Sequence, residues 1–378
     1  MLDYETLRVI WWLILGVLLI GFAITDGFDM GVAAIFRFIS RSEDERHALL
    51  SSVEPVWEGN QVWFILAGGA TFAAWPLLYA TSFSGLYPAI FLLLLTFILR
   101  PVGFGFRSHV DDPRWRNLWD WVLFGSGTGA ALLFGVAFGN LFLGVPFHFD
   151  ALQRPVYTGG FFNLLHPFAL TVGVVSLAML VMHGAAYAAL KVEQPLSQRA
   201  AALGGIAALV FAAAFLVAGF WVVGGLDGYH IVSAVDPLAP SNPLLKTVER
   251  VPRAWLDNYR IQPLLWIAPV GAVLMAVTTW LLLLRRRPGL AFLSSCGVQT
   301  CTILCGGFAL FPFLLPSSTD PGHSLTVWDA SSSAKTLLIM LVAVAIFLPL
   351  ILAYTSWVYR VLKGRITLAH IRRESGLY

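Results

Sequence analysis

Residues Gly59 to Leu99 read GNQVWFILAGGATFAAWPLLYATSFSGLYPAIFLLLLTFIL, a run of 41 residues that contains no Asp, Glu, Lys or Arg. A helix needs about 20 apolar residues to cross a hydrocarbon core about 30 Å thick, so this run is too long for one crossing. Trp75 and Pro76 lie near its middle, an interfacial aromatic residue beside a helix breaker, and the polar segment Thr81 to Ser84 follows them. We expect two membrane-spanning helices here.

Seven other charge-free runs are each long enough for one crossing. They are Val9 to Thr25, Trp121 to Phe149, Pro155 to Leu190, Ala200 to Leu226, Ile261 to Leu284, Pro288 to Thr319, and Thr336 to Tyr359. The sequence therefore predicts an all-α, polytopic integral membrane protein, a bundle of nine transmembrane helices forming one domain over residues 1–378. The composition agrees, because 12% charged residues against 58% hydrophobic ones are too few to cover a water-facing surface. Asp3 and Glu5 precede the first run without a basic cluster, so we expect that run to stay as a helix and not to be a cleaved signal.

The loop charges predict the orientation, because Lys and Arg concentrate on the cytoplasmic side of a membrane. Nine crossings place 17 of the 24 basic residues on one side and 7 on the other. The smaller set is Arg8, Arg154, Lys246, Arg250, Arg253, Arg260 and Lys335. We expect a short periplasmic N-terminus and a cytoplasmic C-terminal tail with the basic residues Arg372 and Arg373.

The longest predicted loop is periplasmic and covers Asp227 to Arg260, residues 227–260. It combines mixed charges with four prolines, a composition that fits a plain connector or an ordered cap with one short helix near Lys246 to Trp255. Elsewhere, glycines at a spacing of four would let helix backbones approach closely. These pairs are Gly27 and Gly31, Gly125 and Gly129, and Gly135 and Gly139.

Acidic residues near the cytoplasmic side are the strongest sign of chemistry. Asp26 and Asp29 share one helix face if the first helix continues to about Phe38. The topology brings Glu58, at the start of the second helix, and Arg100, at the end of the third, to the same depth. Three acids and one arginine in costly surroundings are typical of a proton-conducting arrangement. The alternative is that these carboxylates cap helix ends or reach the headgroups, and Asp120, among tryptophans, favours an interfacial anchor.

The histidines give no pattern typical of haem or metal binding. Only His166 and His183 fall within predicted helices, and both lie on one helix about 25 Å apart, too far to share a metal. We expect each to be a hydrogen-bonded interior residue. His370 lies in the predicted tail. Phosphate loops, nucleophile elbows and Cys-x-x-Cys pairs are missing from the sequence, and its basic residues form no nucleic-acid patch.

Ten sequence blocks resemble one family in fixed order and span nearly the whole chain. They are Tyr4 to Trp12 (YETLRVIWW), Gly21 to Gly31 (GFAITDGFDMG), Trp57 to Trp63 (WEGNQVW), Arg100 to Phe104, Trp115 to Asn117, Gly135 to Asn140, Asp227 to Tyr229, Phe311 to Phe313, Pro316 to Ser318 and Trp328 to Ala330. With these blocks the chain resembles subunit II of cytochrome bd ubiquinol oxidase.

The resemblance implies a role in a bacterial respiratory oxidase of the inner membrane, which couples quinol oxidation to the reduction of oxygen to water. This chain would pair with a homologous subunit I that carries two b-type haems and haem d, and would itself ligate none. It would stabilise subunit I, and alone it would be inactive. A structural quinone, lipid contacts and a small accessory subunit remain open.

The resemblance also implies a cytoplasmic proton route through Glu58, with Asp29, Asp26 and Arg100 beside it. Supporting residues from the same blocks are Trp57, Asn60 and Gln61. Family members often have aspartate in place of Glu58 and an acid where this chain has Gly105, which puts a relay group at that position in doubt. Without the resemblance, a proton-coupled transporter would fit the nine helices and their acids as well. A haem-binding catalytic chain is the third alternative, against which the missing axial ligand pairs argue.

Overall fold

The computed structural model describes residues 2–367, so His370, Arg372 and Arg373 of the predicted tail lie outside the described residues. Within that part, eight helices are each long and apolar enough to cross a membrane, and a bent helix pair adds a ninth span. The spans are α1 (Tyr4–Ile39), α3 (Trp57–Ala74) with α4 (Pro76–Gly85), α5 (Tyr87–Arg107), α6 (Pro113–Leu143), α7 (Pro167–Lys191), α8 (Leu196–Gly225), α10 (Ile267–Leu284), α11 (Pro288–Leu310) and α12 (Ala334–Val361). The predicted all-α membrane bundle is confirmed.

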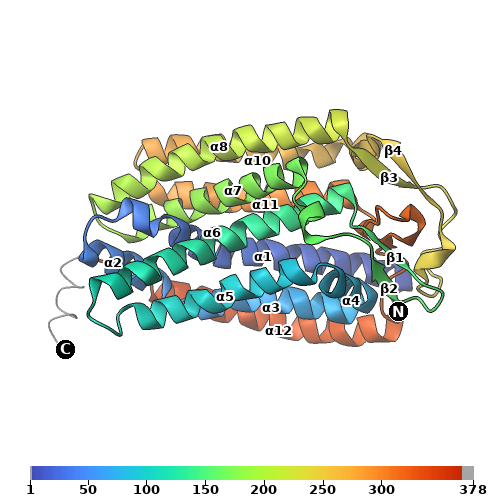
Figure 1. The fold of residues 1–378 in the computed structure, drawn as a ribbon, viewed down its shortest axis with the longest axis horizontal. Coiled ribbons are helices and arrows are strands. Elements are labelled where there is room, and N and C mark those ends of the chain that lie inside the picture. Colours follow the sequence, from blue (N-terminus) through green and yellow to red (C-terminus); the bar gives the residue numbers. More distant parts are fainter. Residues whose placement is uncertain (1, 368–378) are drawn as a thin grey trace.

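The spans run alternately in opposite directions between two different ends (Figure 1). One end, which we call the α2 end, carries the short helix α2 (Glu43–Val53) and the described C-terminal residues. The other, the hairpin end, carries the N-terminal end of α1 and the six β-strands found in residues 2–367. Helix α1 begins where the Asp3 side chain accepts a hydrogen bond from the Thr6 backbone N–H, which satisfies one free donor of the first turn.

The 41-residue run that opened the sequence argument breaks at the expected place. Trp75 separates α3 from α4, and the two helices are bent by 117° because Pro76 cannot continue the hydrogen-bond ladder of α3. The polar segment Thr81 to Ser84 lies inside α4. The run thus forms two spans, the bent pair of α3 and α4 and then α5, and the bend lies at the hairpin end.

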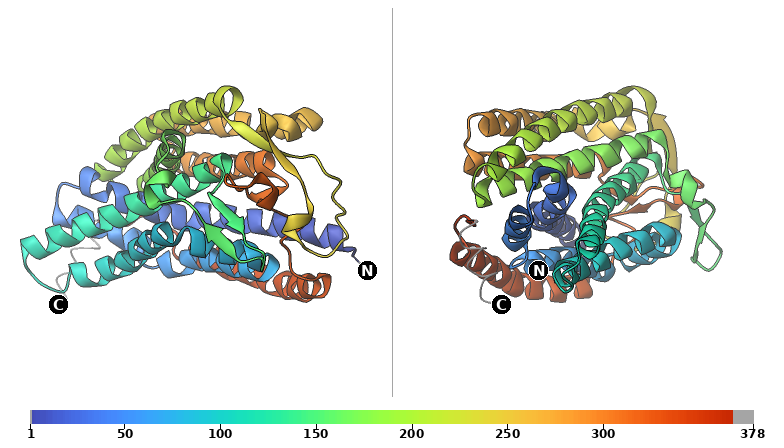
Figure 2. Two further views of the ribbon diagram at one scale, coloured as in Figure 1. Left: turned by 45° about the vertical axis from the view of Figure 1, so that its right-hand side comes forward. Right: turned by 60° about the vertical axis from the view of Figure 1, so that its left-hand side comes forward.

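The predicted run Pro155 to Leu190 is longer than its helix. Helix α7 starts only at Pro167, while Pro155–Tyr157 is strand β2 and Phe161–Leu164 is the 3-10 turn η1. Strand β2 pairs antiparallel with β1 (Phe147–Phe149), and this hairpin projects from the side of the bundle (Figure 2). A lack of charge marks residues near the membrane, but it does not separate a helix from an adjoining hairpin.

Glycines set the closest helix crossings. A Cβ on Gly31 of α1 would lie 2.0 Å from the Leu180 carbonyl oxygen, and one on Gly184 of α7 would lie 2.5 Å from the Gly31 carbonyl carbon. Each helix therefore needs glycine at this crossing. Gly135 and Gly139 of α6 meet α7 with similar closeness, as the spacing predicted. The prediction for Gly125 was wrong, because a Cβ there meets open space.

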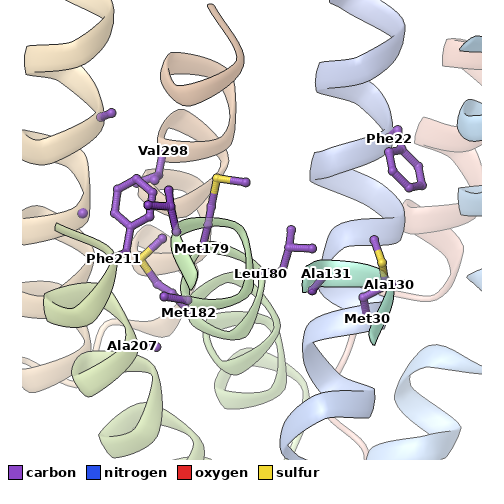
Figure 3. Close-up of a cluster of buried hydrophobic side chains, with 14 of the residues drawn as sticks. Phe22, Met30, Ala130, Ala131, Met179, Leu180, Met182, Ala207, Phe211 and Val298 are labelled. Atoms are coloured by element: carbon purple, nitrogen blue, oxygen red, sulfur yellow. The ribbon is translucent and has the colours of Figure 1, made fainter. Parts of the chain in front are cut away.

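The central core lies between α1, α6, α7, α8 and α11 (Figure 3). Methionine and aromatic side chains fill it, with Met30 of α1, Met179 and Met182 of α7, and Phe211 of α8 facing inward. Small alanines on α6 and α8 let these larger groups interdigitate. Helix α12 differs, because Leu337 is its only buried residue.

The long loop after α8, residues 227–260, forms regular elements, and we call it the cap. Strands β3 (Asp227–Ile231) and β4 (Val248–Pro252) pair antiparallel, and η2 (Pro243–Leu245) lies between them. The helix expected near Lys246 to Trp255 is wrong, because β4 occupies its centre; the helical turns η3 (Ala254–Leu256), α9 (Asp257–Ile261) and η4 (Pro263–Trp266) follow later. A third hairpin, β5 (Phe313–Leu315) with β6 (Leu325–Thr326), and η5 (Pro321–His323) lie at the same end. Buried Lys246 forms an ion pair of 2.8 Å with Asp329, which ties this cap to the loop before α12.

Candidate proton-conducting site

Two aspartates of α1 lie inside the α2-end half of the bundle. Helix α1 continues to Ile39, as expected, so Asp26 and Asp29 are three residues apart on one helix, and both are fully buried. Carboxyl groups at this depth need polar partners because an isolated charge in hydrocarbon is costly.

Asp26 has a charged partner on a different helix. The Nη2 atom of Arg100, on α5, lies 2.7 Å from Asp26 Oδ1, and the Arg100 side chain is almost fully buried. The Arg100 guanidinium also lies 5.1 Å from the ring of Phe97, one turn earlier on α5. Arg100 therefore reaches inward from the last two turns of α5 and ties that helix to α1.

Asp29 is held by an uncharged chain. Asn60 of α3 donates from Nδ2 to Asp29 Oδ2 over 2.8 Å, and Tyr359 of α12 donates its hydroxyl to Asn60 Oδ1 over 2.6 Å. Sequence reasoning missed Tyr359, because a tyrosine beside Arg360 at the end of an apolar run looks like an ordinary interfacial residue. Only the folded chain brings residues 299 positions apart into contact.

The cluster of Asp26, Asp29 and Arg100, which we call the acid cluster, is incompletely hydrogen-bonded. Asp26 Oδ2, Asp29 Oδ1, and Nε and Nη1 of Arg100 are buried without a partner among the described residues. Buried polar groups in proteins are normally paired with protein or with ordered water. Two carboxyl groups with one guanidinium and four free polar atoms form a site suited to bound water and to an exchangeable proton.

Glu58 stands apart from the acid cluster. Its side chain is exposed, on the first turn of α3, and within the described residues it makes no ion pair with Arg100. Trp57 packs against Phe104 with ring centres 6.3 Å apart, and Gln61 is half-buried. Gly105 is exposed, so an acid at that position in other chains would also face outward from this subunit. The structure thus brings together Asp26, Asp29, Arg100 and Asn60, with Glu58 at the surface.

The flanking tryptophans had indicated that Asp120 is an interfacial anchor, and this prediction was wrong. Asp120 belongs to a second buried ion cluster. It is fully buried, and Arg107 Nε lies 2.6 Å from its Oδ1 while Arg46 Nη1 lies 3.1 Å from its Oδ2. Arg37 approaches to 4.0 Å, and Arg107 also pairs with Glu43 over 2.5 Å. This Asp120 cluster ties the end of α1, helix α2, and the adjoining ends of α5 and α6 together.

The two histidines of the fifth predicted span differ. His183 is fully buried, with Nδ1 2.7 Å from Ser295 Oγ and Nε2 2.8 Å from the Ile24 carbonyl oxygen, which confirms the expected interior residue. The expectation for His166 was wrong: it is exposed and caps α7 by accepting from the Phe168 N–H. Within residues 2–367, no group of three or more His, Cys, Asp or Glu side chains is arranged to hold a metal ion.

A large apolar cavity of about 540 Å³ lies towards the hairpin end. Helices α6, α7, α8, α10 and α11 form its walls, and Trp255 and Tyr259 of the cap border it. Its lining is almost entirely aromatic and aliphatic. The volume is in the range typical of small-molecule sites.

Comparison with known proteins identifies the family. The model of the family described as cytochrome bd terminal oxidase subunit II matches residues 7–362. The chain belongs to this family. It is 48% identical to cytochrome bd-I ubiquinol oxidase subunit 2 of Escherichia coli strain K12, over 99% of both chains, and 28% identical to cytochrome bd ubiquinol oxidase subunit 2 of Bacillus subtilis, over 96% of this chain and 97% of that one. A chain in the structure of the bd oxidase from Geobacillus thermodenitrificans has the same fold, with a TM-score of 0.69, 19% identity, and coverage of 94% of this chain and 99% of that one.

Membership of the cytochrome bd subunit II family confirms the resemblance drawn from the sequence blocks. It also decides against the transporter interpretation, which rested on helix number and acids alone. The chain is a multi-pass membrane protein, since its apolar helices and its family agree.

The family implies haems in the complex, and the described residues of this chain do not fit one. Both ring nitrogens of buried His183 are already engaged by Ser295 and Ile24, so neither is free to bind iron. His166 is exposed at the start of α7, where its Nδ1 caps the helix, so it does not face a buried site. Among the described residues His183 is the one buried histidine, so no second buried histidine completes an axial pair with it.

Proposed function

We propose that this chain is the haem-free second subunit of a quinol-oxidising bd-type oxidase in a bacterial inner membrane. Its work there is to stabilise the haem-bearing subunit I and to carry protons from the cytoplasm toward the site of oxygen reduction. Family membership and the Escherichia coli relative named as a ubiquinol oxidase subunit support the complex. The incompletely paired acid cluster is the observation that carries the proton role.

The α2 end faces the cytoplasm in this proposal. The basic residues near it include Arg37, Arg46 and Arg107, the triplet Arg285 to Arg287, and Arg360. The hairpin end has the smaller basic set, mostly within its long cap. This asymmetry supports the orientation because cytoplasmic segments are rich in Lys and Arg.

Glu58 is the residue at which protons enter the proposed route from the cytoplasm. It lies exposed at the start of α3, and Asn60, two residues further on, turns inward to Asp29. Water held by the free oxygens of Asp29 and Asp26 would link Glu58 to these buried carboxyl groups. The ion pair with Arg100 keeps Asp26 in place. No step needs a metal or haem held by this chain.

Subunit I covers the surface next to Glu58. The outward face of α3 continues from Glu58 through the exposed apolar side chains Val62, Ile65 and Phe72, which repeat at helical spacing. A carboxyl group at the edge of such an apolar stripe is costly against lipid but can be partnered by polar groups of another protein. The same stripe supplies contact area that would stabilise the partner.

The test uses Asp29→Asn and Glu58→Gln in the assembled oxidase, with Glu54→Gln as the matched control because Glu54 is exposed on the neighbouring turn. We expect oxygen-linked quinol oxidation per haem to fall by about tenfold or more in Asp29→Asn, and less in Glu58→Gln, because a positioned proton carrier is lost. Haem content measures assembly and should be unchanged. Full turnover in haem-replete Asp29→Asn oxidase would remove the proton-route assignment.

A second proposal assigns the apolar cavity to a structural quinone. Its volume and aromatic walls fit a ring with the start of an isoprenoid tail. Gly219 borders the cavity, and a Cβ there meets nothing within 4 Å, so Gly219→Leu adds a large side chain at the cavity wall with room for its first atom.

Gly224→Leu is the control, because Gly224 also lies on α8 with open space around it but does not line the cavity. We expect quinone extracted from the purified oxidase to fall in Gly219→Leu by about one molecule per complex relative to Gly224→Leu, as a single cavity of this size holds one ring. Equal quinone in the two variants, or loss of phospholipid alone, would contradict the assignment.

A further inference from the structure

Tyr359 lies on the least embedded span of the bundle. Helix α12 exposes most of its apolar side chains, yet its last turns carry a half-buried tyrosine whose hydroxyl points to α3. The Tyr359 ring meets the edge of Phe28, on α1, with ring centres 6.3 Å apart. A peripheral helix thus contributes one polar group to the interior.

That hydroxyl fixes the direction of the Asn60 amide. An amide side chain has an acceptor oxygen on one side and a donor nitrogen on the other, and Tyr359 donates to the oxygen. The nitrogen must then face Asp29, to which it donates over 2.8 Å. Three hydrogen-bonding groups from α12, α3 and α1 therefore form a directed chain that ends on a carboxyl oxygen.

The chain has one arrangement for each protonation state of Asp29, and only the ionised state uses the Tyr359 hydroxyl as a donor to Asn60. With Asp29 ionised, the observed direction places two donors in series toward negative charge, and each bond polarises the next. With Asp29 protonated, its hydroxyl would donate to Asn60 Oδ1 after the amide turns over, and the amide nitrogen would donate to the Tyr359 oxygen. Phenylalanine at 359 would remove the donor that fixes the arrangement with Asp29 ionised.

We propose that Tyr359 is a positioning residue of the proton route, which sets the direction of the Asn60 amide and thereby stabilises the carboxylate form of Asp29. The inference rests on the proposed proton-carrying function. It adds a residue of α12 to a route otherwise built from α1, α3 and α5. Proton transfer would then depend on the packing of α12 against α3.

Other ionisable groups surround the same carboxyl group and stay unchanged in the test. Asp26 lies on α1 itself, Arg100 on α5 and Tyr187 on α7, while Cys296 on α11 faces Tyr359. Tyr187 differs from Tyr359 because its hydroxyl donates to the Ser52 carbonyl oxygen and not toward Asp29. His183 is engaged with Ser295 and Ile24.

The experiment compares Tyr359→Phe with Tyr354→Phe in the assembled oxidase, with oxygen consumption per haem measured between pH 5 and pH 9. Tyr354 is the matched control, since it lies on the same helix and is 64% exposed with its hydroxyl outside the cluster. We expect the pH midpoint of turnover in Tyr359→Phe to rise by about half a unit to one unit, as for one lost hydrogen bond. Tyr354→Phe should match the unsubstituted oxidase.

A merely structural Tyr359 would lower the yield or thermal stability of the complex but would leave the pH midpoint in place, and that result overturns the inference. Asp29→Asn separates the two levels of the argument. If Asp29→Asn slows turnover while Tyr359→Phe leaves the midpoint unchanged, the route stands and the positioning role fails. If Asp29→Asn leaves turnover unchanged, both fail. In the Asp29→Asn background, adding Tyr359→Phe should not move the midpoint further.

Discussion

Two buried ion clusters lie in the same half of the bundle and are built on opposite principles. In the Asp120 cluster, both carboxyl oxygens of the aspartate have guanidinium neighbours, from Arg107 and Arg46. In the acid cluster, one guanidinium serves two aspartates: Arg100 pairs with Asp26, and Asp29 has no ion-pair partner among the described residues. The Asp120 cluster has three arginines for two carboxyl groups, Asp120 and Glu43, whereas the acid cluster has one arginine for two.

The difference separates an architectural ion cluster from one that can exchange protons. Asp120 faces permanent positive charge from several helices, so a proton there would break pairs that hold α2 against the bundle. Asp26 and Asp29 can share one added proton without losing the Arg100 contact, because the Asp29 hydrogen bonds come from the neutral Asn60. Burial alone, which is equal for the three aspartates, does not distinguish them.

The largest expected effect comes from breaking the Asp120 cluster. Asp120→Ala leaves Arg107 and Arg46 buried or half-buried without their shared partner, which should cost about 3–5 kcal/mol and lower the apparent melting temperature by on the order of 10 °C. Haem-replete complex in the membrane should fall accordingly, while turnover per remaining haem stays near normal. Asp29→Asn is the counterpart, with near-normal melting and slowed turnover. Identical behaviour of the two variants would show that the clusters do not differ as proposed.

The bilayer made most of the fold predictable. Length and lack of charge marked the spans, and Trp75 with Pro76 marked the break between α3 and α4, because a membrane imposes both a span length and a cost on charge. The prediction for Gly125 was wrong because glycine spacing identifies a helix face but does not tell which helix packs against it. In the structure, Gly127 makes the close contact with α1.

The site was predictable only in part. Asp26, Asp29 and Arg100 met because helix direction and depth follow from topology. Asp120 was misjudged because its partners include Arg46 on α2, a helix too polar and short to be placed from its sequence. Tyr359 was missed because its role depends on a contact across 299 residues. Pairings made by tertiary packing leave no periodic signal in the sequence.

A smaller effect should appear on acidification, through Glu43 at the outer edge of the Asp120 cluster. Partial burial raises the pKa of Glu43, but the hydrogen bond and charge of Arg107, with Arg46 nearby, outweigh it and hold the pKa below its usual range. A carboxyl group with a lowered pKa in the folded state contributes stability that is present above its unfolded pKa and is lost as pH falls through the folded value. The loss should therefore begin below about pH 4.5.

Glu43→Gln should remove this pH-dependent part. We expect the unsubstituted oxidase to lose more apparent melting temperature between pH 6 and pH 4 than Glu43→Gln does, by a small margin because the Glu43 side chain is 41% exposed and its ion pairs are partly screened. Glu54→Gln, on an exposed residue at the end of the same helix, should leave the acid response unchanged. If Glu43→Gln and the unsubstituted oxidase lose the same apparent melting temperature between pH 6 and pH 4, the ion pairs of Glu43 do not stabilise the Asp120 cluster.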